Sequence, residues 1–366
     1  MGPFDNNQAG VIKLKKLPSL DGLRAISIIL VIISHFLFEQ AIYINKWKPG
    51  PTGVEIFFVI SGFLITTLLI NEKNKNGTIN LKLFYLRRAF RILPLVFLFT
   101  LCLIILNAIF AMNIKFSSFI TIFFVKNLEQ LFTGNSDWYT GHFWTLAVEE
   151  QFYLLFPFLI YKFNIKTYSK ILVYLILFLP VLNYLVNNRI GVFHGNNFIF
   201  KICFILIKLF GSGTVSILIG SLCSVLYNRF RPQLEFLFKF NYLGFVLFLV
   251  AISLRLPFVS DNFNLVFVNV VFDFLIGAMI ISNLNLSSFF AHFLNNRIVM
   301  KIGVLSYSLY VWQQLFTNKQ PWAQLHPLFS SVLFNLMSLL IVAYLSYEFF
   351  EKKFLILKQR FNVIDK

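Results

Sequence analysis

The chain has 366 residues, of which 58% are hydrophobic and only 13% are charged. This composition excludes a soluble globular core, because apolar runs of about 18 or more residues recur along the chain and are long enough to cross a bilayer. A net charge of +17 could indicate nucleic-acid binding, but the positive residues gather in alternate short loops, as the positive-inside rule predicts for a membrane protein. The three cysteines have no ligand-like spacing, so we expect neither a disulfide framework nor a metal site.

Taken in chain order, the apolar runs predict an all-α polytopic membrane protein with about ten transmembrane helices and both termini in the cytoplasm. We expect a multi-pass protein of the inner (cytoplasmic) membrane, with a basic N-terminal segment at 1–16, one membrane domain at 17–354 and a cytoplasmic tail at 355–366. Two further apolar segments, 115–125 and 198–210, could be interfacial or re-entrant. The expected spans are 23–40, 52–71, 91–111, 144–163, 171–187, 210–227, 239–256, 263–282, 300–317 and 328–350.

The first predicted span contains the ionisable residues Arg24 and His35, eleven positions apart. Eleven helical steps end about 20° from where they began, so both side chains lie on one helix face, about 16 Å apart along the axis. A charge at the membrane edge is then aligned with an imidazole near mid-membrane, where ionisable groups are costly and by default functional. The alternative is a histidine that hydrogen-bonds to a neighbouring helix and only stabilises packing.

Three arginines, Arg87, Arg88 and Arg91, lie at the cytoplasmic start of the third predicted span. Positions three and four residues apart are neighbours on a helix, so the guanidinium groups form a cluster. Arginine binds phosphate oxygens in a bidentate manner, which suits a phosphate-rich ligand. Taken alone, the three arginines are better explained as ordinary anchors at the membrane surface. Arg24 is expected on the same side of the membrane, which favours the phosphate site.

Two carboxylates, Glu149 and Glu150, enter the fourth predicted span. Adjacent helix positions point about 100° apart, so at least one carboxylate must face the interior of the bundle. An intramembrane glutamate and His35 could form an acid–base pair, or serve as a proton relay in a transporter. In the second span, Ser61 and Gly62 form a pair of small residues that permits close helix packing.

The ninth predicted span carries hydrogen-bonding side chains along its length, among them Ser306, Tyr307, Ser308, Tyr310 and Gln313. Such a helix either holds its neighbours by interhelical hydrogen bonds or lines a site for a polar substrate such as a sugar. The pattern alone does not separate these two interpretations.

Together these motifs resemble the acyltransferase-3 family of integral-membrane acyltransferases. The matching pieces, which occur in the family's order, are Ser19–Arg24 with His35, Gly53–Leu64, the Arg87, Arg88 and Arg91 group, Trp144–Tyr153, Ser306–Tyr310 and Glu351. The resemblance implies a domain of roughly ten spans that moves an acyl group, usually acetyl from acetyl-CoA, onto a hydroxyl of an extracytoplasmic or membrane-linked acceptor. It also implies that Arg24 and His35 are essential, and that the arginine group contacts the acyl donor.

The chain departs from the family pattern at three positions. Gln313 stands where many relatives carry histidine, Lys353 where proline is frequent and Glu55 where aspartate is common. The family's acceptors are commonly surface polysaccharides, lipopolysaccharide, peptidoglycan or lipid-linked sugars. Because no hydrolase-like domain follows the membrane domain in this sequence, we expect a standalone modifier of polysaccharide or glycolipid rather than of peptidoglycan.

The sequence therefore predicts a membrane O-acetyltransferase with acetyl-CoA, or another acyl-CoA, as donor substrate and with no permanently bound cofactor. The expected acceptor is a surface polysaccharide or a lipid-linked sugar. His35 is expected to be the general base or a transient acyl carrier, with Glu149 beside it and Asp21 holding Arg24. The expected donor-binding residues are Arg24, Arg87, Arg88 and Arg91, and the expected substrate-lining residues are Ser61, Tyr153, Tyr307, Tyr310 and Gln313.

Two competing interpretations remain open at this point. The first is a proton-coupled transporter or flippase of a sugar or glycolipid, with His35 and Glu149 as its relay. The second is a structural membrane scaffold, for which loss of His35 would leave every activity intact.

Overall fold

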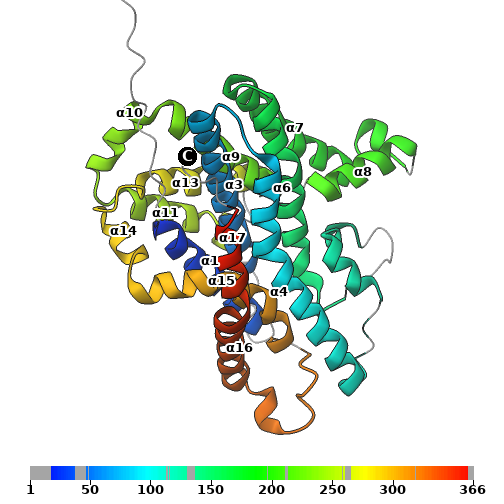
Figure 1. Cartoon of the computed structure of the whole chain (residues 1–366). Coiled ribbons are helices and arrows are strands. Elements are labelled where there is room, and N and C mark those ends of the chain that lie inside the picture. The colour runs from blue at the N-terminus through cyan, green and yellow to red at the C-terminus, as the bar shows by residue number, and fades with distance from the viewer. Residues whose placement is uncertain are drawn as a thin grey trace, which may run out of the picture.

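The computed structural model of the chain describes residues 18–37, 47, 49–112, 114, 116–129, 137–195, 197–210, 213–257, 259, 265–317 and 319–361. Within these ranges the regular elements are helices and there is no strand (Figure 1), which confirms the predicted all-α fold class. The predicted basic segment 1–16 lies outside the described residues.

The helices vary widely in length. In chain order they are α1 (Pro18–Leu37), α3 (Pro49–Asn76), α4 (Leu81–Phe110), α6 (Trp144–Lys162), α7 (Ile165–Asn187), α8 (Phe198–Phe210), α9 (Thr214–Arg229), α10 (Arg231–Leu234), α11 (Leu243–Ser253), α13 (Leu265–Ser282), α14 (Phe289–Leu294), α15 (Arg297–Phe316), α16 (Val332–Ser346) and α17 (Lys352–Gln359). A π-helical turn, Tyr347–Glu351, joins α16 to α17.

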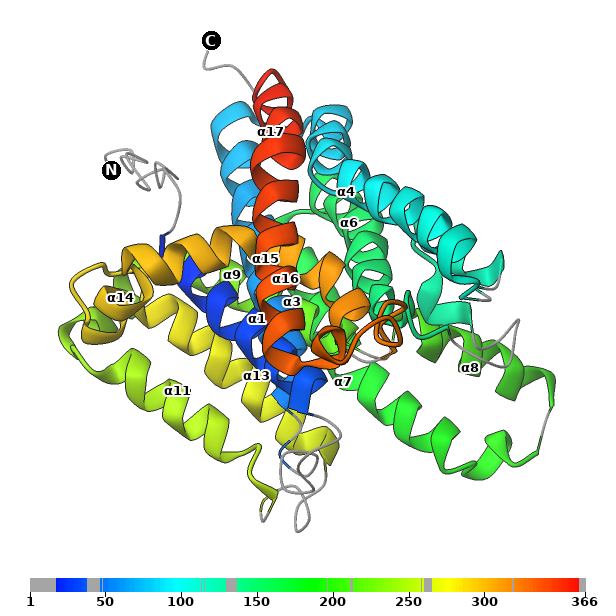
Figure 2. The same ribbon diagram turned by 90° about the horizontal axis from the view of Figure 1, so that it is seen from below.

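Helices α1, α3, α9 and α15 form the centre of the molecule. The most extensive contacts between described elements are those of α3 with α9 and of α1 with α15 and α3. Both ribbon views place α7 and α8 on one side of this centre and α11 and α14 on the other (Figures 1 and 2). Helices α16 and α17 follow one another in a single line across the centre (Figure 2).

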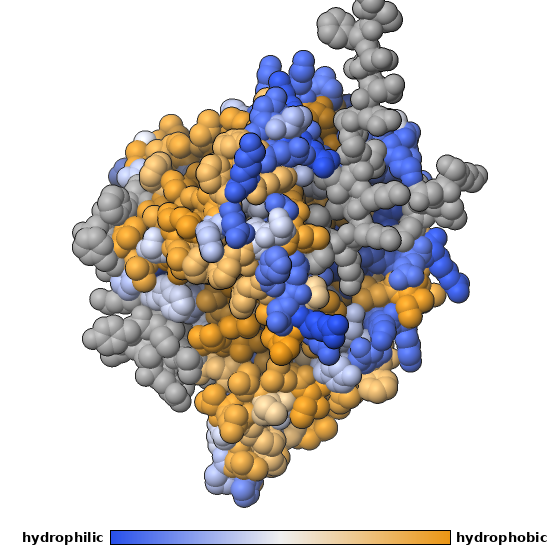
Figure 3. All heavy atoms as spheres, turned by 90° about the vertical axis from the view of Figure 1, so that its left-hand side faces the viewer, coloured by the Kyte–Doolittle hydropathy of each residue, from blue (hydrophilic) through white to orange (hydrophobic). Residues whose placement is uncertain are grey.

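The number of membrane spans differs from the prediction. Six of the described helices are long and apolar enough to cross a bilayer, or eight if the bent pairs α8–α9 and α10–α11 each form one span. The predicted count of ten is therefore not confirmed, because α11 has only 11 residues and α15 carries many polar side chains. The orientation, with both termini cytoplasmic, stays a prediction. An apolar surface covers most of one face, with hydrophilic side chains toward the top and right of the view (Figure 3).

The two uncertain apolar segments are helical but short. Residues Phe116–Phe123 form a 3₁₀ helix within the segment 115–125, and the segment 198–210 forms α8. Helix α8 meets α9 at an angle of 55°. Neither element is long enough to cross a bilayer alone, since a spanning helix needs about 20 residues.

Glycines allow the central helices to approach closely. A Cβ atom on Gly62 would overlap the carbonyl oxygen of Ile217, and one on Gly220 would overlap the carbonyl oxygen of Val59. Helices in a bilayer gain little from burying apolar surface against each other, so close backbone contact and interhelical hydrogen bonds must hold them together. These two glycines therefore fix the separation of α3 and α9.

Hydroxyl groups extend this α3–α9 contact towards the end of α3. The Thr66 and Ser221 hydroxyls lie 2.6 Å apart, and those of Thr67 and Ser224 lie 2.7 Å apart. The Tyr168 hydroxyl on α7 lies 2.7 Å from the same Ser221 oxygen. This buried network links α3, α7 and α9 at one level of the bundle.

We expect Gly62→Ala to lower the free energy of unfolding by about 1–3 kcal/mol, because the added methyl group forces α3 and α9 apart. Thermal unfolding of the purified protein in detergent, followed by circular dichroism, measures the change. Gly141→Ala is the matched control, since a Cβ at Gly141 meets no atom within 4 Å. Equal unfolding midpoints for the two variants would contradict the close-contact argument.

Candidate active site

Three adjoining cavities run through the interior. The first, called the α17 cavity, has a volume of about 450 Å³ and is lined by Asp21, Glu351 and Lys358 among others. The second, the central cavity, has a volume of about 80 Å³ and contains Ser61 and Glu149 in its wall. The third, the histidine cavity, has a volume of about 760 Å³ and includes His35 and His142.

Shared wall residues show that the cavities are neighbours. Arg24, Arg91 and Tyr307 line both the α17 cavity and the central cavity. Val54, Phe58 and Tyr310 line both the central cavity and the histidine cavity. The narrow central cavity thus lies between two larger ones. Helix α1 contributes Arg24 to the first two cavities and His35 to the third, as expected for residues on one helix face at different depths.

The α17 cavity is strongly cationic. Arg24 forms an ion pair with Asp21 at 3.0 Å, which is the predicted role of that aspartate. Arg24 also lies within electrostatic range of Arg88 and Arg91. Lys358 of α17, which was not expected from the sequence, has the same arginines as neighbours. These four cations, three around the α17 cavity and Arg88 in the adjoining central cavity, repel each other, so an anionic ligand would relieve that repulsion.

Glu149 lies with the arginines rather than with His35. Its Oε1 accepts a hydrogen bond of 2.6 Å from Ser61, and its charge interacts with Arg88, Arg24 and Arg91. The described contacts include no hydrogen bond between Glu149 and His35, so the expected pairing is corrected. Arg88 lies 4.5 Å above the ring of Tyr153, a cation–π contact that fixes it in the central cavity.

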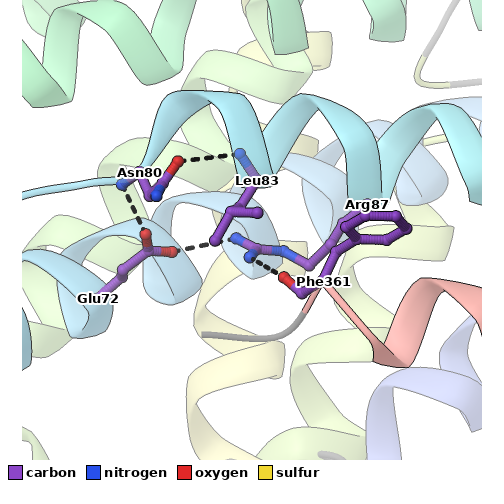
Figure 4. Close-up of polar contacts among 5 residues, drawn as sticks. All are labelled: Glu72, Asn80, Leu83, Arg87 and Phe361. Carbon is purple, nitrogen blue, oxygen red and sulfur yellow. Dashed lines mark hydrogen bonds and ion pairs between the residues drawn. The ribbon is translucent and has the colours of Figure 1, made fainter. Parts of the chain in front are cut away.

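Arg87 points away from the cavities. Its guanidinium donates to Glu72 at 3.1 Å and to the carbonyl oxygen of Phe361 at 3.0 Å, and these contacts are drawn in Figure 4. Glu72 also accepts from the backbone N–H of Asn80, whose side chain caps the start of α4. Arg87 lines none of the three cavities, so it ties the start of α4 to the end of the described chain instead of joining Arg88 and Arg91.

The histidine cavity contains two imidazoles with defined hydrogen bonds. Nδ1 of His35 lies 2.8 Å from the carbonyl oxygen of Val31. A carbonyl oxygen only accepts, so Nδ1 carries the proton and Nε2 of the neutral ring keeps its lone pair. His142 has the opposite arrangement, because its Nε2 lies 3.1 Å from the carbonyl oxygen of Val311 and its buried Nδ1 has no partner. Each ring thus offers one basic nitrogen.

His142 is the main residue that the sequence interpretation missed. It lies near enough to His35 for their charges to interact. It precedes the Trp144 motif, at the point where the 3₁₀ turn Gly141–Phe143 leads into α6. The sequence did contain a signal for His142, because this histidine lies just before the Trp144 motif at the start of a predicted helix. Among the described residues, no group of three His, Cys, Asp or Glu side chains is arranged to hold a metal ion.

Four of the five expected lining residues meet in the central cavity. They are Ser61, Tyr153, Tyr307 and Tyr310. Tyr310 stands at the boundary with the histidine cavity, where its hydroxyl lies 2.6 Å from that of Thr145 and 2.7 Å from the carbonyl oxygen of His142. Gln313 is fully buried and lines none of the described cavities, whereas its neighbour Gln314 lines the histidine cavity.

Fold and site together define a multi-pass helical membrane protein with a polar interior route from a cationic cavity to a pair of histidines. The chain belongs to the acyltransferase-3 family, whose model, described as an acyltransferase domain, matches residues 17–349. No solved structure matches the chain significantly.

Two relatives with curated names are similar to most of this chain. O-acetyltransferase OatA of Staphylococcus aureus (strain NCTC 8325 / PS 47) is 29% identical over 365 residues, covering 92% of this chain and 56% of the relative. Peptidoglycan O-acetyltransferase OatA of Listeria monocytogenes serovar 1/2a is 28% identical over 365 residues, covering 92% of this chain and 55% of the relative. The chain thus spans a little over half the length of these relatives.

Glu351 connects the π-helical turn to α15. Its Oε1 accepts hydrogen bonds from Ser308 at 2.6 Å and Ser346 at 3.3 Å. We expect Glu351→Ala to cost about 1–3 kcal/mol of stability, because the Ser308 hydroxyl is left buried without its partner.

The matched control is Glu348→Ala in the same turn. Glu348 forms a more exposed ion pair with Lys352 at 2.7 Å, and solvent screens such pairs, so their loss has little effect on stability. Thermal unfolding in detergent should separate the two variants. Similar losses in both would argue against the buried role of Glu351.

Proposed function

We propose that the chain is a membrane O-acetyltransferase that takes acetyl from acetyl-CoA at the α17 cavity and delivers it to a carbohydrate hydroxyl at the histidine cavity. The observation that carries this proposal is the order of the three adjoining cavities, with cations at one end and two basic imidazoles at the other. In this proposal the α17 cavity faces the cytoplasm, as the positive-inside rule predicts.

The cations of the α17 cavity would bind the phosphate groups of the donor. Arg24, Arg91 and Lys358 line that cavity, and Arg88 lines the adjoining central cavity. Guanidinium groups bind phosphate oxygens in a bidentate manner, and lysine adds a point charge. With the phosphates held there, the thin pantetheine arm would enter the narrow central cavity and bring the thioester towards His35.

The chemistry needs a base and a site that excludes water. Nε2 of His35 would accept the proton of the acceptor hydroxyl while the hydroxyl oxygen attacks the thioester carbon and the CoA thiolate leaves. Alternatively, Nε2 would attack the thioester itself, and the acyl-imidazole would then pass its acetyl group to the hydroxyl. In either route His142 would supply the second basic nitrogen, and the buried helix walls would limit hydrolysis of the thioester.

The acceptor is proposed to be a glycan outside the cytoplasm. A relative's name includes peptidoglycan, which supports adding peptidoglycan to the polysaccharides and lipid-linked sugars expected from the sequence. Family membership favours acyl transfer over the alternative of a proton-coupled transporter or flippase. Glu149 lies with the arginines rather than with His35. The proton relay of a transporter would therefore lack the expected contact between Glu149 and His35.

His35→Ala should abolish acetylation of surface glycans, because the variant loses the nitrogen that would act as base or acyl carrier. Cells that express the native protein, His35→Ala or His292→Ala at matched levels would be compared. Mass spectrometry of the extracted glycans would count acetyl groups that mild alkali removes. His292 is an exposed histidine of α14 outside the described cavities, so that variant should keep the native pattern. Native acetylation in the His35→Ala cells would refute the assignment.

Arg91→Gln should weaken CoA binding by about tenfold or more, since one lost charge-assisted hydrogen bond costs about 1.5–3 kcal/mol. Arg87→Gln should leave the affinity within about twofold, because Arg87 faces Glu72 and not the cavities. Isothermal titration of CoA into protein in lipid nanodiscs would measure both affinities. An equal loss in the two variants would show that the whole arginine group, not the α17 cavity, binds the donor.

A further inference from the structure

A fourth cavity adjoins the histidine cavity from the side. This side cavity has a volume of about 370 Å³ and lies among α7, α8, α9 and α13. Glu55 and Gly213 line both the side cavity and the histidine cavity, so a ligand group in one space can be covalently continuous with a group in the other. The volume falls in the usual range for small-ligand sites, about 300–1,000 Å³.

The lining of the side cavity combines amides, carboxylates, the Ser216 hydroxyl and the Lys208 amine with apolar groups. Asn183 and Asn187 come from the end of α7, and Asn269 and Asp273 come from α13. Leu179 and Pro180 cover a neighbouring part of the wall. Amide and carboxylate side chains bind hydroxyl groups as acceptors or donors, which is the pattern that a carbohydrate needs.

Arg255 lies at the centre of a polar cluster beside the side cavity, and its hydrogen bonds go to residues other than Asp273. Arg255 pairs with Glu55, donates to Asn269 at 2.6 Å and lies 4.0 Å above the ring of Phe272. The charges of Arg255 and Glu55 also act on Asp273, so the cluster contains one guanidinium and two carboxyl groups.

Asp273 is a second carboxylate, and it is 99% buried, with 1% of its surface exposed. Ser216 hydrogen-bonds to it, yet its Oδ1 has no hydrogen-bond partner. Buried polar atoms are nearly always paired, so an unpaired carboxylate oxygen in a cavity wall marks a place for a ligand donor.

We propose that the side cavity is the glycan subsite of the proposed acetyltransferase, where it holds the sugar ring next to the one that is acetylated. Asp273 accepts hydrogen bonds from hydroxyl or amide N–H groups of that ring, and Asn183 and Asn187 bind its other polar groups. The ring that carries the reacting hydroxyl lies in the histidine cavity, whose wall includes Trp138 and Trp144. This inference rests on the proposed function for the identity of the acceptor.

The test compares two subsite variants with a matched control in lipid nanodiscs. Asn183→Leu and Asp273→Asn remove polar groups of the side cavity, whereas Asn188→Leu changes a residue at the end of α7 that does not line it. The probes are a peptidoglycan tetrasaccharide, chitotetraose and maltotetraose. Equilibrium dialysis measures the affinities of these probes. A CoA titration shows whether the α17 cavity is still folded. Acetyl transfer from acetyl-CoA gives KM for the glycan.

We expect both subsite variants to raise Kd and KM for the bound tetrasaccharide by about tenfold, the effect of losing one or two buried hydrogen bonds. Affinity for CoA should not change, and Asn188→Leu should match the native protein. If Asp273→Asn also loses CoA binding, the fold of that variant is disturbed. The Asn183→Leu variant, which changes a half-exposed residue, then tests the subsite alone. Unchanged tetrasaccharide Kd in Asn183→Leu, or no saturable binding of any probe by the native protein, would overturn the subsite.

Failure of the proposed function gives a different result. Native protein that binds a tetrasaccharide through Asn183 and Asp273 but transfers no acetyl group would refute the acetyltransferase and support the subsite. Native protein that transfers acetyl while both variants keep the native KM would refute the subsite alone.

Discussion

Close contact between helix backbones is the constraint on which the rest of the structure depends. In a bilayer the lipid tails are as apolar as the helix surfaces, so packing has to come from short distances and interhelical hydrogen bonds. Gly62 and Gly220 bring α3 against α9, while Gly53 and Gly303 bring α3 and α15 against the backbone of α1. Helix α1 is thereby held between two neighbours, and its Arg24 and His35 both face the interior.

The interior then places the cluster of arginines and the two histidines in different cavities. Cationic side chains collect around the α17 cavity, and carboxylates such as Glu149 partly balance them in the central cavity. The histidine cavity instead offers neutral imidazole nitrogens. In the proposed reaction the charged donor binds at one end and only its uncharged acyl group advances, which avoids the cost of moving phosphate through a low-dielectric interior.

The sequence predicted the fold class, the inward face of α1 and four of the five central lining residues, because helical periodicity and the cost of buried polar groups determine all three. It did not predict contacts that depend on tertiary packing. Arg87 differs from Arg88 by one step of about 100°, enough to turn it towards Glu72. Lys358 reaches the arginines only because α17 packs beside α4. For the same angular reason Gln314 lines the histidine cavity and Gln313, which was expected to line the site, does not. Ten spans were not confirmed, because α11 has only 11 residues and α15 carries many polar side chains.

The π-helical turn between α16 and α17 changes which helix positions face the interior. The buried side of α16 passes through Asn335, Leu339, Ala343 and Ser346 in steps of three or four. An uninterrupted α-helix would next bury residue 349 or 350, yet Phe349 is 67% exposed and Glu351 is buried. The extra residue rotates everything after it by about 100°. Helix α16 can therefore keep a lipid-facing apolar surface while α17, on the same axis, turns Lys358 inward. The length of this one turn, rather than the composition of α17, decides whether α17 lines the cationic cavity or faces the solvent.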